Sequence, residues 1–399
     1  MEKGQPPQFQ LRRRGIFYRS LLKSQFATNF MPLPQFVKFH NLAQIVAAFC
    51  DSQRPARIRT LDRDSEGFSG AIVLRVVVEE TKTASEADYC LRGWPPDSLP
   101  RERLLGLHRL LEHIHHCGVT QVPVPLTSRF GTTMHTEAGQ FWQLEPWMPG
   151  LADFSSDPSD QRLRNGMTVL AQWHEAASRF EARTSESEWF QQCSAATSPT
   201  VQDRLERIHR FTRTDAARLR QLVAEPTPLE PWGAELPELR DLARQILDFF
   251  DRSAPRVGED LLAYRDLRLR LHPCLRDVWH DHLLFEGDQV TGLIDATAAR
   301  TETPATDLAR LLGSLLGDSD DRWEMALTAY RGVRPLSDRE ARLARVLDQS
   351  TALLSGLTWL ERLFVQRLNY SNPPRVLSRL RQITARMERL ASRQQSVVV

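Results

Sequence analysis

A strand that is broken by two prolines, QFWQLEPWMPG at residues 140–150, most constrains what this chain can fold into. Strand and helix patterns alternate before it, and mainly helical patterns follow it to the end of the chain. Pro146 and Pro149 cannot donate to a strand ladder or continue a helix, so they favour an extended connection between two unlike units. The sequence therefore predicts an α+β protein of two lobes with a hinge near residues 145–150.

The part before the hinge has the pattern of a small lobe built on an antiparallel sheet. A β-branched run at 72–78, a polar turn and a second strand at 88–94 predict a hairpin, and an amphipathic helix is expected at 100–116. We predict an N-terminal lobe over residues 35–146 and a larger, mainly helical C-terminal lobe over residues 147–399. Residues 1–34 are basic and predict a disordered extension or a start site placed too early, with a targeting segment or a basic arm as the alternative.

Charge and composition exclude several classes of function. A formal net charge of +2 gives no global basis for binding nucleic acid or an anionic membrane. No apolar run approaches the roughly 18 residues that a membrane-spanning helix needs. The five cysteines show no CxxC spacing and no apolar leader precedes them, which predicts reduced thiols in a cytoplasmic protein.

Two aspartates flank a predicted hairpin in the second lobe. Asp277 precedes VWHDHLLF and the turn EGDQ, and the returning strand VTGLID ends at Asp295. A hairpin brings the chain back to its starting end, so we expect the two carboxylates to converge. Transfer of a γ-phosphoryl group uses such parts: a carboxylate for the attacking hydroxyl, oxygen ligands for Mg²⁺, and cations over the phosphates.

The segment CLRDVWHDHLLFEGDQVTGLIDATAARTETPATDLARLL, residues 274–311, resembles the aminoglycoside phosphotransferase and choline kinase-like family of small-molecule kinases. The family pattern is His-Gly-Asp, four residues, Asn, then Gly-x-Ile-Asp and Asp-Leu-Ala. LEPWMPG resembles the family's hinge and VLAQWHEA its first large-lobe helix, so the resemblance covers roughly residues 55–370. It implies a bilobal, protein-kinase-like fold.

The resemblance also implies a function: ATP-dependent transfer of the γ-phosphate to a hydroxyl of a small metabolite, with Mg²⁺ or Mn²⁺. Asp277 takes the position of the catalytic base, with Arg276 beside it. Asp295 and His282 take the two metal-binding positions. Asp307 takes the position of the structural acid of Asp-Leu-Ala.

The same resemblance assigns the nucleotide-binding positions. Arg92 falls where a lysine contacts the α- and β-phosphates, with Glu102, or less favourably Glu112, as its partner acid. The remaining positions are the phosphate-covering loop and the hinge backbone that holds adenine, at Ser69, Gly70, Glu145 and Trp147.

Three positions depart from the family pattern. Leu275 replaces the loop histidine, His282 replaces the second metal ligand, and Arg92 replaces lysine. Imidazole is a poor ligand for Mg²⁺, so either Asp295 holds the ion with waters or the site takes Mn²⁺. A zinc site at residues 280–282 is the weaker reading, because i,i+2 side chains diverge and no third ligand is placed. Arginine keeps the charge of lysine but changes its shape.

These departures leave other functions open. One is a pseudokinase-like nucleotide-binding or regulatory module with little turnover. Another is an α/β protein in which the spacing of Asp277 and Asp295 is accidental. The arginine-rich helix at 201–222 fits a solvated face, or a site that favours an anionic substrate over a polycationic one.

Overall fold

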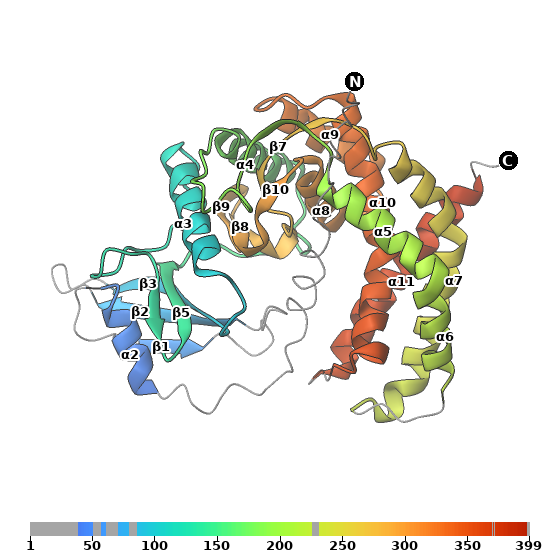
Figure 1. Ribbon diagram of the computed structural model, residues 1–399, viewed down its shortest axis with the longest axis horizontal. Coiled ribbons are helices and arrows are strands. Elements are labelled where there is room, and N and C mark those ends of the chain that lie inside the picture. The colour runs from blue at the N-terminus through green and yellow to red at the C-terminus, as the bar shows by residue number, and fades with distance from the viewer. Residues whose placement is uncertain are drawn as a thin grey trace, which may run out of the picture.

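The computed structural model describes residues 39–50, 57–60, 71–79, 86–225, 231–368, 370 and 372–396. In these ranges a sheet-based lobe and a larger, mainly helical lobe lie side by side (Figure 1). The predicted basic extension over residues 1–34, together with Ser69 and Gly70, lies outside the described residues.

The smaller lobe contains an antiparallel sheet with the strand order β1-β2-β3-β5-β4. Its strands are β1 (Arg57–Thr60), β2 (Ile72–Glu79), β3 (Glu86–Trp94), β4 (His135–Glu137) and β5 (Gln140–Pro146). The β2–β3 pairing confirms the predicted hairpin. In the β3–β5 ladder, Arg92 lies opposite Gln143 and Cys90 lies opposite Glu145, which fixes the polar contacts described below.

Two helices accompany this sheet. α2 (Phe39–Ala47) packs Leu42 and Ile45 against a core that includes Val76 and Leu144. α3 (Arg101–His116) lies between the sheet and the larger lobe (Figure 1). Beside Arg92, a Cβ atom on Gly93 would come within 2.6 Å of the Trp142 ring, so a larger residue there would displace the indole. Close packing thus fixes the strand that carries Arg92.

The centre of the larger lobe holds short β-structure and the helix that covers it. The strands are β6 (Cys193–Ala196), β7 (Leu269–Cys274), β8 (Leu283–Glu286), β9 (Gln289–Leu293) and β10 (Arg300–Glu302). β10, β7 and β6 form one small sheet, and β8 pairs with β9 as the predicted hairpin around the EGDQ turn. These strands meet α4 (Asp160–Ala177), which begins at the side-chain cap of Ser159.

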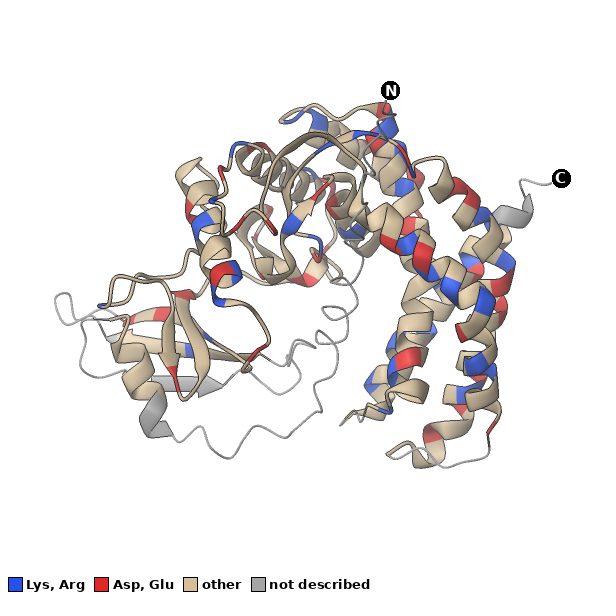
Figure 2. Cartoon of the chain, in the orientation of Figure 1, with Lys and Arg blue, Asp and Glu red and all other residues tan. Residues whose placement is uncertain are grey.

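The rest of the larger lobe is a bundle of helices (Figure 1). They are α5 (Pro199–Arg210), α6 (Ala216–Ala224), α7 (Leu236–Leu262), α8 (Ala305–Leu315), α9 (Asp320–Arg331), α10 (Asp338–Leu360) and α11 (Pro373–Ser396). A capping box between Ser337 and Glu340 begins α10. Acidic and basic side chains are interspersed over α5, α7 and α11 (Figure 2).

Several short turns complete the described part of the chain. The π-helical turns are Phe211–Asp215 and Glu361–Val365, and the 3₁₀ turns are Gly233–Glu235, His280–His282 and Ala296–Ala298. Within the described residues, no helix combines the length and apolarity required to cross a bilayer. The α+β, two-lobed, protein-kinase-like class predicted from the sequence is confirmed. The lobe boundary at residue 146 stays a prediction.

Candidate active site

The loop after β7 is held by the buried carboxylate of Asp307. The backbone N–H groups of Leu275 and Arg276 donate to Asp307 at 2.7 and 2.6 Å. Arg276 takes a left-handed backbone conformation with φ of +65°, which is uncommon for a residue with a side chain. The two bonds account for this geometry, because they require both N–H groups to face Asp307. The loop that carries Asp277 is thereby fixed at its first residues.

A histidine from α4 supports the same carboxylate. His174 Nε2 lies 3.0 Å from Asp307 Oδ2, and Tyr330 Oη lies 2.8 Å from His174 Nδ1. Burial raises the pKa of Asp307 to about 7 and lowers that of His174 well below its usual range. A neutral imidazole that donates through Nε2 and accepts from the tyrosine satisfies this chain of bonds. Leu275, in place of the family's histidine, therefore leaves Asp307 anchored from another element.

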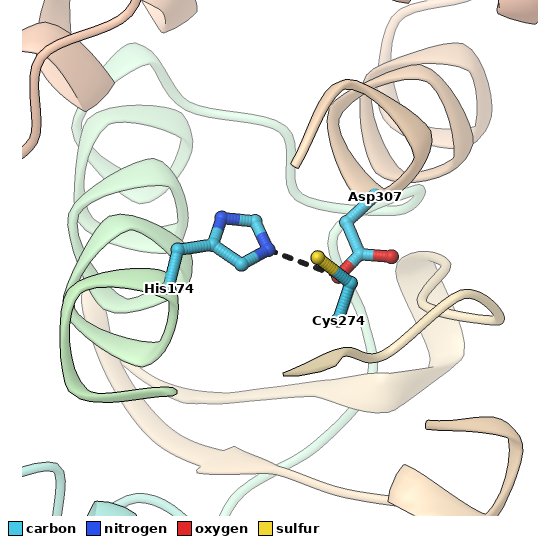
Figure 3. Close-up of side chains that lie close together, drawn as sticks. All are labelled: His174, Cys274 and Asp307. Atoms are coloured by element: carbon cyan, nitrogen blue, oxygen red, sulfur yellow. Dashed lines mark hydrogen bonds and ion pairs between the residues drawn. The ribbon is translucent and has the colours of Figure 1, made fainter. Parts of the chain in front are cut away.

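Cys274 lies close to His174 and Asp307, and the three side chains are buried together (Figure 3). Their ligand atoms lie within 4.8 Å of one another, a spacing that a metal ion could bridge. However, the thiol of Cys274 donates to the backbone carbonyl of Glu302 at 3.3 Å, and burial raises its pKa well above the usual range. A metal would require the thiolate. We therefore interpret this group as a hydrogen-bonded support of the loop.

Asp277 is exposed and is held through one oxygen. Arg310 of α8 donates to Asp277 Oδ1 from Nη2 at 2.7 Å and from Nε at 3.1 Å. In the described part of the chain no donor reaches Oδ2. The guanidinium therefore orients the carboxylate and leaves one oxygen for another group.

Asp295 follows β9 and also adopts a left-handed conformation, with φ of +60°. Its Oδ1 accepts from Arg92 Nη1 at 3.0 Å and from the Thr297 hydroxyl at 2.8 Å. Burial alone would raise its pKa, but the charge of Arg92 and the hydrogen bonds from Arg92 and Thr297 outweigh burial and lower it. An ionised carboxylate whose Oδ2 is turned from these donors can hold a divalent cation.

His282 lies beside Asp295, as the sequence predicts. Its Nε2 is 3.9 Å from Asp295 Oδ2 and accepts a 2.8 Å hydrogen bond from the indole N–H of Trp279. Burial lowers the pKa of His282, while the charges of Asp295 and Asp277 oppose that shift. The imidazole is thus neutral, and its one lone pair already has a donor. A metal bound at Nε2 would have to displace Trp279.

The acid beside Arg92 differs from the predicted one. Arg92 Nη2 lies 3.7 Å from Glu145 Oε1, whereas Glu102 is exposed on the first turn of α3. Among the described residues, the acids within ion-pair distance of Arg92 are Asp295 and Glu145. The expected pairing of Arg92 with Glu102 is therefore wrong in this structure, because that carboxylate faces away and strand β5 supplies the acid instead.

At the predicted hinge, Glu145 and Trp147 have partners within the protein. The side chain of Glu145 is buried and its backbone lies in the β3–β5 ladder. The backbone N–H of Trp147 donates to Asp88 at 3.0 Å, so adenine would have to displace that bond. Arg75 lies over the Trp147 ring, 5.1 Å from its centroid. The role of these two residues toward adenine stays a prediction.

Arg92 lines a small pocket. Its empty volume of about 320 Å³ includes open solvent, and it is bounded by β3, β5, α3 and the loop after Asp295. Trp94, Leu107 and Leu111 form an apolar wall, while Arg92 and Glu145 face it with polar groups.

The arginines of α5 contact other parts of the helical bundle. This helix is therefore neither a purely solvated face nor an open site for an anionic ligand. Arg204 donates to the Leu347 carbonyl and to Ser350, and Arg207 donates to Thr358 at 2.9 Å. Arg210 pairs with Glu361 at 3.3 Å. These side chains tie α5 to α10 and its end. Their first role is to hold the bundle together.

Sequence reasoning missed several residues of this site: Glu145 as an acid, Thr297, Trp279, His174 and Arg310. The β3–β5 register would have indicated Glu145, since residues 143 and 145 share a strand face with their partners on β3. Arg310, next to Asp-Leu-Ala, gave no local signal. Its bond to Asp277 depends on how α8 packs under the loop.

Comparison with known proteins gives the family. The profile of the phosphotransferase enzyme family matches residues 65–345. A homoserine kinase of Rhizobium johnstonii is 32% identical over 133 residues, which make up 32% of this chain and 38% of that protein. A homoserine kinase of Methylobacterium nodulans is 27% identical over 263 residues, 63% of this chain and 67% of that protein. The first match thus spans less than half the length of the relative.

A solved structure shows the same fold. Amicoumacin kinase hAmiN, in complex with AMP-PNP, Ca²⁺ and Ami, superposes with a TM-score of 0.55 over 87% of this chain and 94% of that one. Its sequence identity is 14%, so the likeness concerns the fold. The family profile, in contrast, extends over both lobes and includes the loop of Asp277, the hairpin and Asp295. On that match, the chain belongs to the phosphotransferase enzyme family.

Proposed function

We propose that the protein is a kinase that transfers the γ-phosphate of ATP to a hydroxyl of a small metabolite. One observation carries the proposal: Asp295, its Arg92 partner and His282 lie together, and the β8–β9 hairpin pairs Leu283 with Leu293, so the segments that carry Asp277 and Asp295 leave the same end of that hairpin. An acceptor-side carboxylate, a metal-side carboxylate and a cation are the parts that phosphoryl transfer needs. The family assignment supports the same reaction.

Asp295 fits one divalent cation. It is ionised, Oδ1 is held by two donors, and Oδ2 faces the space beside His282. When bound, Mg²⁺ or Mn²⁺ would neutralise charge on the transferred phosphate. His282 does not fit a second Mg²⁺ well, because nitrogen is a poor ligand for that ion and Nε2 is bonded to Trp279. We therefore assign the essential cation to Asp295.

The side chains divide the remaining work. Asp277 uses its free Oδ2 to orient the acceptor hydroxyl and take its proton, while Arg310 holds Oδ1. Arg92 places a fixed positive charge beside the phosphates and Asp295. The loop below stays rigid through the two N–H bonds to Asp307.

The substrate we propose is a small amino alcohol, with L-homoserine as the first compound to test. The relatives named homoserine kinase support this choice. Arg310 bound to Asp277, and Arg276 next to it, make the acceptor side more cationic than a polycationic aminoglycoside favours. The scattered free thiols agree with a reducing, cytoplasmic location, which stays a prediction, as does the absence of nucleic-acid and membrane partners.

The test is a coupled assay of ADP release with purified protein, ATP and Mg²⁺ or Mn²⁺. The panel contains L-homoserine, L-serine, choline, aminopropanol and an aminoglycoside. We expect turnover of a small amino alcohol that Asp277→Asn abolishes. If every compound in the panel were inert, or the variant kept full activity, the proposal would be wrong.

A second function, a nucleotide-binding module with little turnover, is favoured by one observation. The lone pair of His282 is bonded to Trp279, so the second metal position offers no free ligand atom. Calorimetric titration with ATP, with and without Mg²⁺, separates the two. Binding without turnover of any panel compound would establish the second function.

A further inference from the structure

Two chains of polar contacts, part-buried on the Asp295 side and buried on the β5 side, run from Arg92 to α3. Together with the α3 backbone between Arg103 and His108, they form what we call the ring. It runs from Arg92 to Asp295 at 3.0 Å and from Asp295 to the Thr297 hydroxyl at 2.8 Å. The Thr297 carbonyl then accepts from Arg103 of α3 at 2.9 Å. The helix carries the ring from Arg103 to His108, the next side chain in it.

From α3 the ring returns to Arg92 through strand β5. His108 Nε2 lies 2.9 Å from Gln143 Oε1, and Gln143 Nε2 donates to Glu145 Oε2 at 2.7 Å. Glu145 Oε1 closes the ring 3.7 Å from Arg92 Nη2. Gln143 and Glu145 face the same side of β5 because side chains two residues apart share a strand face.

On the β5 side, the hydrogen bonds form a directed chain that ends at the Glu145 carboxylate. Gln143 donates its amide N–H to Glu145, so its carbonyl must accept, from Trp94 Nε1 at 3.2 Å and from His108 Nε2. His108 Nδ1 then accepts from the Thr133 hydroxyl at 2.7 Å. Burial lowers the pKa of His108 to about 4, which agrees with this neutral tautomer. The chain of donors delivers positive hydrogen-bond ends to the Glu145 carboxylate.

Arg92 lies between two acidic side chains of this ring. Burial works against its charge, but Asp295 and Glu145 outweigh burial and raise the pKa of Arg92. Burial raises the pKa of Glu145, while Arg92 and Gln143 act in the opposite sense. Burial raises the pKa of the neighbouring Cys90 thiol to about 12, so it stays neutral. Without Glu145, Arg92 would keep Asp295 as its acid but would lose the partner that faces Nη2.

We infer that Glu145 is the positioning residue for Arg92, and that the ring through Gln143, His108 and Arg103 couples α3 to the nucleotide site without an acid from that helix. The inference rests on the proposed function and goes beyond it. The two Nη atoms of Arg92 face different acids, Nη1 toward Asp295 and Nη2 toward Glu145, whereas a lysine would carry its three donors on a single nitrogen. The ring thus accounts for arginine at this position.

The test measures binding of MgATP by calorimetry, which does not depend on the acceptor substrate. We expect Glu145→Gln to weaken MgATP binding about tenfold, as the loss of an outer-shell partner does at other sites. Glu145→Asp should recover part of the affinity. Glu102→Gln, at the exposed position next to Arg103, is the matched control and should bind as the wild type does. Kinetics should show the loss in KM for ATP more than in kcat.

The outcomes separate the inference from the function it rests on. A wild-type protein that binds no MgATP would contradict the proposed function. If the wild type binds MgATP and Glu145→Gln binds it equally well, or Glu102→Gln loses more, the inference alone is overturned. Should Glu145→Gln fail to fold by circular dichroism, Arg103→Gln replaces it, with the exposed Arg101→Gln as its control. Equal binding by both of these variants would also overturn the inference.

Discussion

Asp277 and Asp295 are similar carboxylates in different surroundings. Each has Oδ1 held by donors, but among the described residues Asp277 is held by Arg310 alone, whereas Asp295 is held by Arg92 and Thr297 and sits in a left-handed turn. The Asp295 side chain is 38% exposed and its pKa is lowered, while 52% of the Asp277 side chain faces solvent. The comparison teaches that one carboxylate is fixed by several donors and ionised while the other stays accessible, which is the division of work that the proposed reaction requires.

The largest effect is expected at Asp277. Asp277→Asn removes the group that takes the proton of the acceptor hydroxyl, so kcat should fall about 10²–10⁴-fold. MgATP affinity, measured by calorimetry, should stay within about twofold, because Asp277 does not contact Arg92 or the metal position. A variant that lost nucleotide affinity and turnover together would remove the distinction between the two carboxylates.

Asp295→Asn tests the second carboxylate of the comparison, the one to which we assign the cation. The neutral amide can keep a hydrogen bond to Arg92 but offers a cation less charge, so metal-dependent ATP binding should weaken about a hundredfold. Metal-free ATP binding should change far less, since Arg92 then loses an internal competitor for the phosphates. Titrations with Mg²⁺, Mn²⁺ and chelator measure both effects. Equal losses with and without metal would contradict the assignment of the cation to Asp295.

Arg310→Gln sharpens the comparison at Asp277. The single partner of that carboxylate is lost, so Oδ2 is no longer fixed toward the acceptor, and kcat should fall about tenfold or more. Arg310→Lys should recover little, because one ammonium cannot reproduce two N–H bonds to one oxygen. Arg322, an arginine of the neighbouring α9 that pairs with Asp160, provides a control as Arg322→Gln. Unchanged kcat in Arg310→Gln would show that the loop alone orients Asp277.

The smallest effect is expected at His282. His282→Asn offers an oxygen ligand beside Asp295 and releases the indole of Trp279, so Mg²⁺ affinity in the presence of ATP should rise about tenfold. Mn²⁺ affinity should change less, because that ion accepts nitrogen ligands more readily than Mg²⁺ does. Metal titrations of the wild type and the variant give both quantities. Weaker Mg²⁺ binding in the variant would instead make His282 itself a ligand.

The sequence predicted most of the fold because the signals for it are local. Hydrophobic periodicity marked α3, α4 and the hairpins, and Pro146 marked the end of β5. It did not predict that α7 would continue through Pro255, because packing of a long apolar face overrides the local break. The sequence also predicted that Asp277 and Asp295 flank a short hairpin, and the β8–β9 pairing confirms that hairpin.

The partners of the site residues were harder to predict from the sequence. Glu102 and Arg103 are neighbours in the sequence, yet they point about 100° apart on a helix, so a shift of one position decides which of them reaches the site. The sequence could not supply that rotation. It comes from the burial of Leu104, Leu107 and Leu111 against the rest of the molecule.

By itself, the sequence determined the two-lobed fold class and the hairpin between Asp277 and Asp295, since each is written in a stretch of neighbouring residues. Only the tertiary structure decided that Glu145 of β5 lies beside Arg92, that His174 supports Asp307, and that Arg310 holds Asp277. Arg92 and Asp295 are 203 residues apart, and His174 and Asp307 are 133 apart. Contacts at such separations depend on how whole elements pack, which fixes where each side chain points.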